Sequence, residues 1–470
     1  MTEAVELRLQ DLARCFDGAI PVVLVTVSAA GVPNVTYLSK AHVVDHERIA
    51  LSNQFLSKSA RNLAEVPRGS LLIIEPTAHD EYRLDIAYER TERRGRVFDE
   101  LKSEIDAIAA HTGMQEVFRL RAADIYRVTR IRQVPANERA DGSAGTDPWT
   151  TRPPRATADV AGLGELCARI ARCTDLDVLV KVTLDGLAEL LSYEQSMLLL
   201  LDEGGRRLFT LASHGYEHEG VGSEVAVGEG VIGLAAERAA PVRVGNAHQI
   251  AKYARSVRRS FEASGAIEPG REIELPGLPF ADSRVAVPAL ALGQLVGVLA
   301  VEAVASAEFV AADEAALTVI ASLVGTAIES IRAEERAASA GAPAKTSPSA
   351  SPMAGAAGAA PTTHVRFFAI DGSTFLDGDY VIKGVAGRLL WSLLRQYERE
   401  GRTEFTNREV RLDPTLALPD FRDNFESRLI LLKRRLDERE ATIRVEKTGR
   451  GRFRLAVTGN VRLDELPTSS

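Results

Sequence analysis

One stretch of small residues most constrains how this chain can fold. Ala337–Thr363 consists almost entirely of alanine, serine, glycine, proline and threonine. Such a segment cannot bury enough apolar surface to offset the entropy it would lose on ordering. Pro135–Asp159 has a similar composition. The chain therefore cannot close around one core, and we expect three domains, residues 1–134, 160–336 and 364–462, joined by linkers at 135–159 and 337–363.

The net charge and the cysteine content limit which ligands and partners the chain can bind. The formal net charge is −8, so any contact with nucleic acid must come from a local basic patch. Cys15, Cys167 and Cys173 show no CxxC spacing and have no histidine nearby, so neither a zinc site nor a disulfide framework is indicated. The N-terminus lacks the apolar region of a signal peptide. We expect a cytoplasmic protein.

The C-terminal part follows a regular order of helices and hairpins. A leucine-rich pattern predicts a helix over 386–400, and Thr406 with Glu409 forms a capping box that opens a short second helix. Pro419 suits the start of a third helix. The apolar stripe of that third helix is regular and predicts packing on a core: Phe421, Phe425, Leu429, Leu432 and Leu436.

The other faces of this third helix carry groups that can recognise a nucleic acid. Asn424, Ser427 and Arg434 lie opposite the apolar stripe, and Arg428 and Arg435 lie at one flank. Amides, hydroxyls and guanidinium groups can read base edges in a major groove. A predicted hairpin follows over 443–457, and its basic residues suit phosphate contacts: Lys447, Arg450 and Arg452.

This C-terminal segment resembles the winged-helix output domain of response regulators. The resemblance lies in SRLILLKRRLDERE followed by IRVEKTGRGRFRL, with phenylalanine where that family usually has tyrosine. It implies a winged helix-turn-helix that binds DNA through the third helix and the hairpin. The alternative is a small α+β interaction domain whose arginines are simply solvated.

The N-terminal domain reads as short strands with few helices, which predicts a small barrel. Ile49–Asn53, the helix start Ser57-Lys-Ser and the stretch Val66–Ser70 resemble the flavin-binding split barrel of the pyridoxamine-phosphate-oxidase-like superfamily. This implies an FMN phosphate held by Ser57, Lys58 and Ser59, with Ser52 and Asn53 nearby. A helix N-terminus with a serine and a lysine also suits an anion physically. The alternative for Ser57-Lys-Ser is a plain helix cap.

The central domain resembles a GAF domain, an α/β sensor module. The residues that carry the resemblance are Gly228–Glu237, Ala240–Val244, Ser283–Pro288 and Gly297–Val301. It implies a small-molecule effector and a homodimer paired through helices over 163–191 and 312–337. His214 and Tyr216 follow a strand, where they either line a pocket or pack against the sheet edge.

The fold class expected overall is multidomain α+β: a split β-barrel, a GAF domain and a winged helix. We find no catalytic constellation and no metal motif in the sequence. The favoured function is a one-component transcriptional regulator that couples flavin or small-ligand sensing to sequence-specific DNA binding. The alternatives are a flavin-dependent oxidoreductase with regulatory domains and an interaction scaffold.

Overall fold

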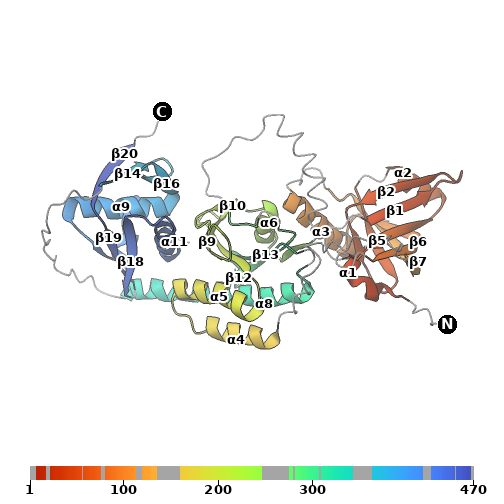
Figure 1. The fold of residues 1–470 in the computed structure, drawn as a ribbon, viewed down its shortest axis with the longest axis horizontal. Helices are drawn as coiled ribbons and strands as arrows, with labels where there is room; N and C mark the ends of the chain where they lie inside the picture. Colours follow the sequence, from red (N-terminus) through yellow and green to blue (C-terminus); the bar gives the residue numbers. More distant parts are fainter. Residues whose placement is uncertain are drawn as a thin grey trace, which may run out of the picture.

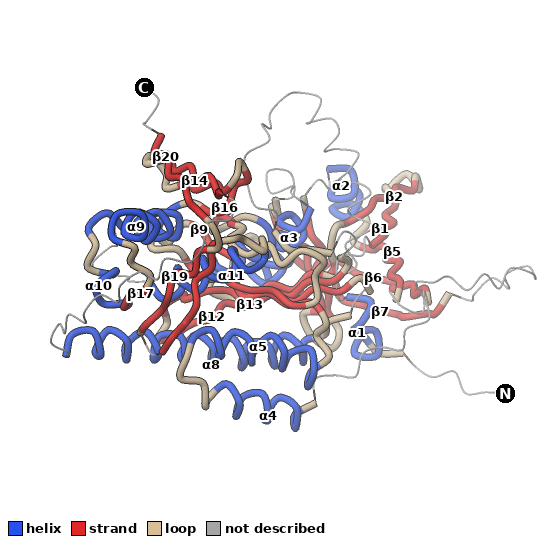
Figure 2. The backbone as a smooth tube through the Cα atoms, turned by 60° about the vertical axis from the view of Figure 1, so that its left-hand side comes forward, coloured by secondary structure: helices blue, strands red, loops and turns tan. Residues whose placement is uncertain are grey.

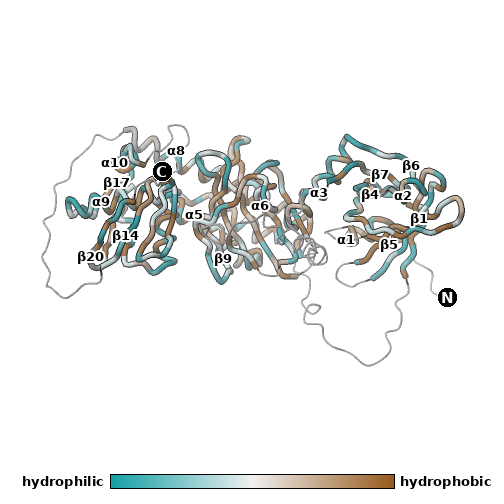
Figure 3. Tube along the Cα trace, turned by 90° about the horizontal axis from the view of Figure 1, so that it is seen from above, coloured by the Kyte–Doolittle hydropathy of each residue, from teal (hydrophilic) through white to brown (hydrophobic). Residues whose placement is uncertain are grey.

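Three domains lie in a row along the long axis of the molecule (Figure 1). Viewed from above, apolar residues concentrate in the strands inside each domain (Figure 3). The computed structural model describes residues 7–16, 22–54, 57–75, 80–112, 119–134, 159–245, 275–278, 281–305, 308–341, 362–416, 425–449 and 451–466.

The N-terminal domain is built on a curled seven-stranded antiparallel sheet with the order β2-β1-β5-β6-β7-β4-β3. Its inner face buries leucines such as Leu24, Leu51, Leu71 and Leu84 together with Tyr126. Helix α2 begins at the predicted residue, Ser57. The bounds are η1 Leu9–Leu12, α1 Ala13–Phe16, β1 Val22–Val27, β2 Pro33–Leu38, β3 Ala41–Val43, β4 Arg48–Asn53, α2 Ser57–Glu65, β5 Arg68–Ile74, β6 Glu81–Glu92, α3 Arg96–Thr112 and β7 Ala122–Gln133.

The central domain has a six-stranded antiparallel sheet with the order β10-β9-β8-β13-β12-β11. Helices α4, α5 and α8 lie on one side of it (Figure 2), and α6 lies on the other side (Figure 1). Gly233 lets α6 sit close to the loop before it, because an added Cβ would lie 2.2 Å from the Ala226 carbonyl oxygen. The bounds are α4 Val160–Ile170, α5 Leu176–Leu191, β8 Gln195–Leu201, β9 Arg207–His214, β10 Glu224–Ala226, α6 Gly230–Arg238, β11 Val242–Val244, β12 Ser283–Ala291, β13 Gln294–Ala303 and α8 Ala311–Gly341.

One sequence prediction for this domain was wrong. The single helix expected over 163–191 is two helices, α4 and α5. Asp175 ends the connection between them, since its side chain accepts hydrogen bonds from the amides of Asp177 and Val178 and so caps α5.

The C-terminal domain contains the predicted order of elements. Strands β14, β15 and β16 precede three helices, and the hairpin β18–β19 follows them. The last strand, β20, joins the first three in a four-stranded sheet, β16-β15-β14-β20, and β17, which lies between α9 and α10, joins the hairpin in a three-stranded sheet, β17-β19-β18. The capping box of Thr406 and Glu409 is confirmed. Strand β20, which pairs in parallel with β14, extends the domain past the expected residue 462. The bounds are β14 Thr362–Phe368, β15 Ser373–Leu376, β16 Asp379–Ile382, α9 Gly384–Glu400, β17 Glu404–Thr406, α10 Asn407–Arg411, η2 Pro414–Leu416, α11 Phe425–Glu438, β18 Ile443–Gly449, β19 Arg452–Val457 and β20 Asn460–Leu466.

Helix α3 joins the first two domains. Ala107 and Ala110 pack into the apolar layer that contains α6. Arg238 of α6 donates to the hydroxyl of Ser103 at 2.6 Å and also pairs with Asp106. Glu104, in the same turn of the helix, pairs with Lys40 and His42 of the barrel. This helix therefore belongs to both domains.

Helix α8 is the one described helix long and apolar enough to cross a membrane by length and composition, over Ala311–Glu334. Its apolar side packs against the core of the central domain. Ile320, Val324 and Ile328 are fully buried against the central sheet. Core helices of globular domains commonly have such a composition.

Candidate functional sites

The start of α2 is the predicted phosphate site of the barrel. Three of its predicted residues make hydrogen bonds within the domain: the Ser52 hydroxyl accepts from the Lys40 amide at 3.2 Å, the Ser59 hydroxyl accepts from the Asn34 amide group at 2.9 Å, and Asn53 donates to Asp124 at 2.9 Å. Lys58 is exposed in the first turn, and Ser57 begins the helix. The groups that fit a phosphate are therefore Lys58 and the first-turn amides.

Asp124 organises a polar network that the sequence did not reveal. Its carboxylate accepts from Asn53 and also from the Thr91 hydroxyl at 2.5 Å, while Tyr88 bonds to Thr91 at 2.8 Å. Next to it, burial raises the pKa of Tyr126, and the Tyr126 hydroxyl has no hydrogen-bond partner among the described residues. The signal was an aspartate among the buried residues that begin β7, residues 122–126.

The central domain has a polar corner on the α6 side of its sheet. Glu302 of β13 is 6% exposed, and its carboxylate lies 2.8 Å from Nε of Arg284, the residue directly opposite on β12. The Leu278 amide donates to its other oxygen at 2.9 Å. Tyr216 lies in the same layer, and its buried hydroxyl has no partner among the described residues.

The protonation of this corner follows from burial. Burial raises the pKa of Glu302, although Arg284 and the Leu278 amide oppose the rise. Burial and then the charge of Glu302 raise the pKa of Tyr216. A phenol that stays protonated is a hydrogen-bond donor, so the corner can offer a donor to the acceptor of a small molecule. Of the two residues singled out in sequence, Tyr216 lies here and His214 pairs with Asp185 at 3.4 Å.

Helix α11 does not present its predicted reading side to solvent in this structure. The expectation of a solvent-exposed face was wrong for this conformation. Ser427 is fully buried and accepts from Arg332 of α8 at 3.0 Å, and Arg428 is 8% exposed. The reason is that the central domain covers this side, a contact that helical periodicity cannot reveal.

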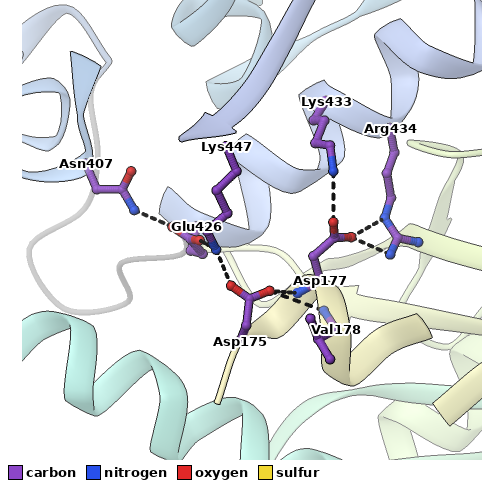
Figure 4. Close-up of polar contacts among 8 residues, drawn as sticks. All are labelled: Asp175, Asp177, Val178, Asn407, Glu426, Lys433, Arg434 and Lys447. Atoms are coloured by element: carbon purple, nitrogen blue, oxygen red, sulfur yellow. Dashed lines mark hydrogen bonds and ion pairs between the residues drawn. The ribbon is translucent and has the colours of Figure 1, made fainter. Parts of the chain in front are cut away.

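Ion pairs hold α11 and β18 to the central domain. Arg434 makes two hydrogen bonds to Asp177, at 3.0 and 2.6 Å, and Lys433 pairs with the same residue at 2.9 Å (Figure 4). Lys447 pairs with Asp175 and lies 3.3 Å from Glu426. Carboxylates and phosphates both offer negatively charged oxygens that arginine and lysine can bind with similar geometry.

A second point of contact involves the turn between β8 and β9 and strand β9 itself. Arg428 makes two hydrogen bonds to Glu203, at 2.8 and 2.5 Å, and its guanidinium carbon lies 3.9 Å from the ring centroid of Phe209. The guanidinium thus has a carboxylate and an aromatic ring, a strong combination when shielded from water.

The other predicted contact residues differ in position. Arg435 is buried and donates to the Val381 carbonyl oxygen at 3.0 Å, so it supports the C-terminal domain internally. Arg452 is exposed on β19. Asn424 and Arg450 lie outside the described residues. Among the described residues no group of histidine, cysteine, aspartate and glutamate could hold a metal ion.

Two family models match the chain. A model of the pyridoxamine 5'-phosphate oxidase family matches residues 9–129, and a model of GAF domains matches residues 173–329. The chain thus contains a pyridoxamine 5'-phosphate oxidase-like domain followed by a GAF domain. A search of curated proteins found no match.

Several solved structures are similar to parts of the chain. An FMN-binding protein from Syntrophomonas wolfei subsp. wolfei is 19% identical, with 24% of this chain and 76% of that chain covered and a TM-score of 0.22. The GAF domain of an Acinetobacter phosphoenolpyruvate-protein phosphotransferase is 23% identical, with 37% and 94% covered and a TM-score of 0.30. Free methionine-R-sulfoxide reductase from Neisseria meningitidis is 20% identical, with 37% and 89% covered and a TM-score of 0.29. At these TM-scores the likenesses carry no argument about activity.

The Glu302–Arg284 pair predicts a pH dependence. Arg284→Met removes the charge that opposes the raised pKa of Glu302, so that pKa should rise further. A carboxyl whose pKa is raised in the folded state stabilises the fold fully at pH below its unfolded-state pKa. This stabilisation is lost as pH rises through the folded-state pKa, and it amounts to about 1.4 kcal/mol for each unit by which the two pKa values differ. Relative to the parent, the thermal midpoint of Arg284→Met should therefore fall as pH rises above the ordinary pKa of a glutamate. The double variant with Glu302→Gln should show no such fall, and an equal fall in both would exclude Glu302 as its source.

Proposed function

We propose that the chain is a one-component transcriptional regulator of the cytoplasm, in which the barrel and the GAF domain sense small molecules and the C-terminal domain binds DNA. The observation that carries the proposal is the C-terminal order of sheet, three helices and a basic hairpin. Helix α10 is short and capped, α11 carries arginines, and β18–β19 follow at once. This is the order of a winged helix-turn-helix.

The roles within this domain divide by position. In the proposed complex α11 enters the major groove with Ser427, Arg428 and Arg434 toward the bases. The hairpin lies beside it, with exposed Arg444 and Arg452 on its strands suited to phosphate contacts. Asn424, Lys447 and Arg450 remain in the proposal as further contacts, whereas the internal bonds of Arg435 suit a supporting role.

The barrel is proposed to hold FMN by its phosphate. The match to the pyridoxamine 5'-phosphate oxidase family supports a flavin. Lys58 and the first-turn amides of α2 would hold the phosphate with Ser57, and the engaged Ser52, Asn53 and Ser59 would keep that helix start in place. FMN would supply a redox-active ring to this domain. A flavin-dependent oxidoreductase is the alternative if the loaded protein turns over a substrate.

The chain is also proposed to form a homodimer through the helices of the GAF domain. Three exposed valines support this: Val160 of α4 is 81% exposed, Val178 of α5 51% and Val319 of α8 50%. These helices share one side of the central sheet. Exposed apolar side chains on neighbouring helices favour association.

Sedimentation tests the dimer. The full chain should sediment with twice the mass of one chain at micromolar concentration, and Val319→Lys should shift it toward monomer because a charge would enter an apolar contact. Asp185→Lys, on the exposed side of α5 where the side chain is 39% exposed, is the control and should leave the mass unchanged. A parent chain that sediments as a monomer excludes the dimer.

Flavin titration tests the phosphate site. Lys58→Ala should weaken FMN binding by about 1–2 kcal/mol, the contribution of one charge-assisted hydrogen bond, in a titration of apoprotein followed by flavin fluorescence. Arg96→Ala removes a 78% exposed cation from α3 and is the matched control. If Lys58→Ala and Arg96→Ala bind FMN like the parent, α2 does not hold the phosphate.

DNA binding tests the main proposal. Arg452→Ala should weaken binding to every sequence about equally and reduce the slope of log K against log salt by roughly one, because one phosphate contact is lost. Arg462→Ala removes a 68% exposed arginine from β20 and should change little. Arg434→Ala should relax the sequence preference among genomic fragments instead.

Two results would contradict the proposal. If neither the parent chain nor a variant with Asp177→Asn and Glu203→Gln, which lacks the carboxylates that hold Arg434 and Arg428, binds a genomic fragment, residues 364–462 are not a DNA reader and the interaction scaffold replaces it. If Arg452→Ala and Arg462→Ala weaken binding by the same amount, the effect is one of net charge and β18–β19 is not the wing.

A further inference from the structure

The side of α11 proposed to read DNA lies against an acidic surface of the GAF domain. We define this surface, the acidic rim, as Asp175, Asp177 and Glu203. We propose that the acidic rim competes with DNA for the basic side chains of α11 and β18, so that the described arrangement is a closed state that must open before DNA binds. This inference rests on the proposed function and adds its regulation.

Burial shows that the closed state excludes a duplex. Ser427 at the middle of the contact is 0% exposed and is bonded to Arg332, and Arg428 is 8% exposed. A major-groove contact needs these positions within reach of base edges. Lys447 of β18 is held by Asp175, so the hairpin is engaged by the same surface as the helix.

The carboxylates of the rim are arranged as stand-ins for phosphates. Arg428 bonds to both oxygens of Glu203, the fork geometry that arginine also uses with phosphate. Arg434 donates twice to one oxygen of Asp177. The partners favour the charged forms: Arg428 lowers the pKa of Glu203 and Arg434 lowers that of Asp177, each against the effect of burial. Hydrogen bonds from Lys447 to Asp175 raise the pKa of that lysine against its own desolvation.

Asp175 of the acidic rim is oriented by backbone amides of its own domain. One oxygen of Asp175 accepts from the amides of Asp177 and Val178, while the other faces Lys447 (Figure 4). Buried apolar residues of the two domains also form one continuous cluster. The contact between the two domains therefore combines an oriented carboxylate with buried apolar surface. When it opens, new interactions, such as those with DNA, have to compensate for the loss of both.

The inference makes an unusual prediction about salt. Salt weakens protein–DNA binding through counterion release, but it also weakens the ion pairs that close the chain. The parent should therefore show a flatter dependence of log K on log salt than a chain that is already open. Apparent affinity also falls in proportion to the fraction of open chains.

The test compares two full-length double variants on a mixed-sequence DNA duplex. Asp177→Asn with Glu203→Gln should bind about tenfold more tightly than the parent at low salt and show the steeper salt slope. Glu165→Gln with Glu189→Gln removes the same charge from α4 and α5, where the side chains are 57% and 65% exposed and pair with Arg169. This control should bind like the parent.

Small-angle scattering provides a readout without DNA. The radius of gyration of Asp177→Asn with Glu203→Gln should exceed that of the parent and of the control, while circular dichroism shows the same secondary structure in all three. Tighter binding, the steeper slope and the larger radius together support the inference.

The failures can be told apart. Equal binding by all three chains overturns the competition and leaves DNA binding intact. Tighter binding by the control as well, or without a change in radius, overturns it in favour of a net-charge effect. Absence of binding by every chain at any salt overturns the proposed DNA function, and the competition with it.

Discussion

Burial of both faces of the central sheet is the constraint on which the rest of the structure depends. Its strands are apolar on both sides, so each face needs a cover. Helices α4, α5 and α8 cover one face, and their buried residues continue into the C-terminal domain. On the other face α6 is short, and Ala107 and Ala110 of α3 extend its layer. The GAF domain thus completes its core with parts of both neighbours.

Much of the fold could be predicted from local sequence, because the signals for it are local. Helix α2 and the Thr406–Glu409 capping box are set by side chains within a few residues of one another. The break between α4 and α5 was missed because the apolar period continues across it, although Asp175 is a good N-cap residue. Strand β20 was missed because it is short and largely exposed.

The functional residues were harder to place than the elements. Periodicity identified the side of α11 opposite the apolar stripe, but it cannot tell whether that side meets water or another domain. Glu203 and Asp177, which occupy it, are far away in the chain. The Glu302–Arg284 pair was missed for a similar reason: its meaning depends on the register of two strands. A chain with a net charge of −8 concentrates part of its acid where its basic helix docks.

Helix α3 has a consequence for how the first two domains respond to their surroundings. Glu104 holds Lys40 and His42 of the barrel, and Ser103 and Asp106 hold Arg238 of α6. One rigid body thus has a fixed position in two cores at once. A ligand of the barrel that favours another position of α3 would therefore also change the position of α6. Because coupling between two binding sites is reciprocal, a ligand of the GAF domain would affect the barrel to the same extent. A small molecule bound to the GAF domain would then change the affinity of the barrel for its cofactor by some factor. The cofactor, once bound, would change the affinity of the GAF domain for that small molecule by the same factor.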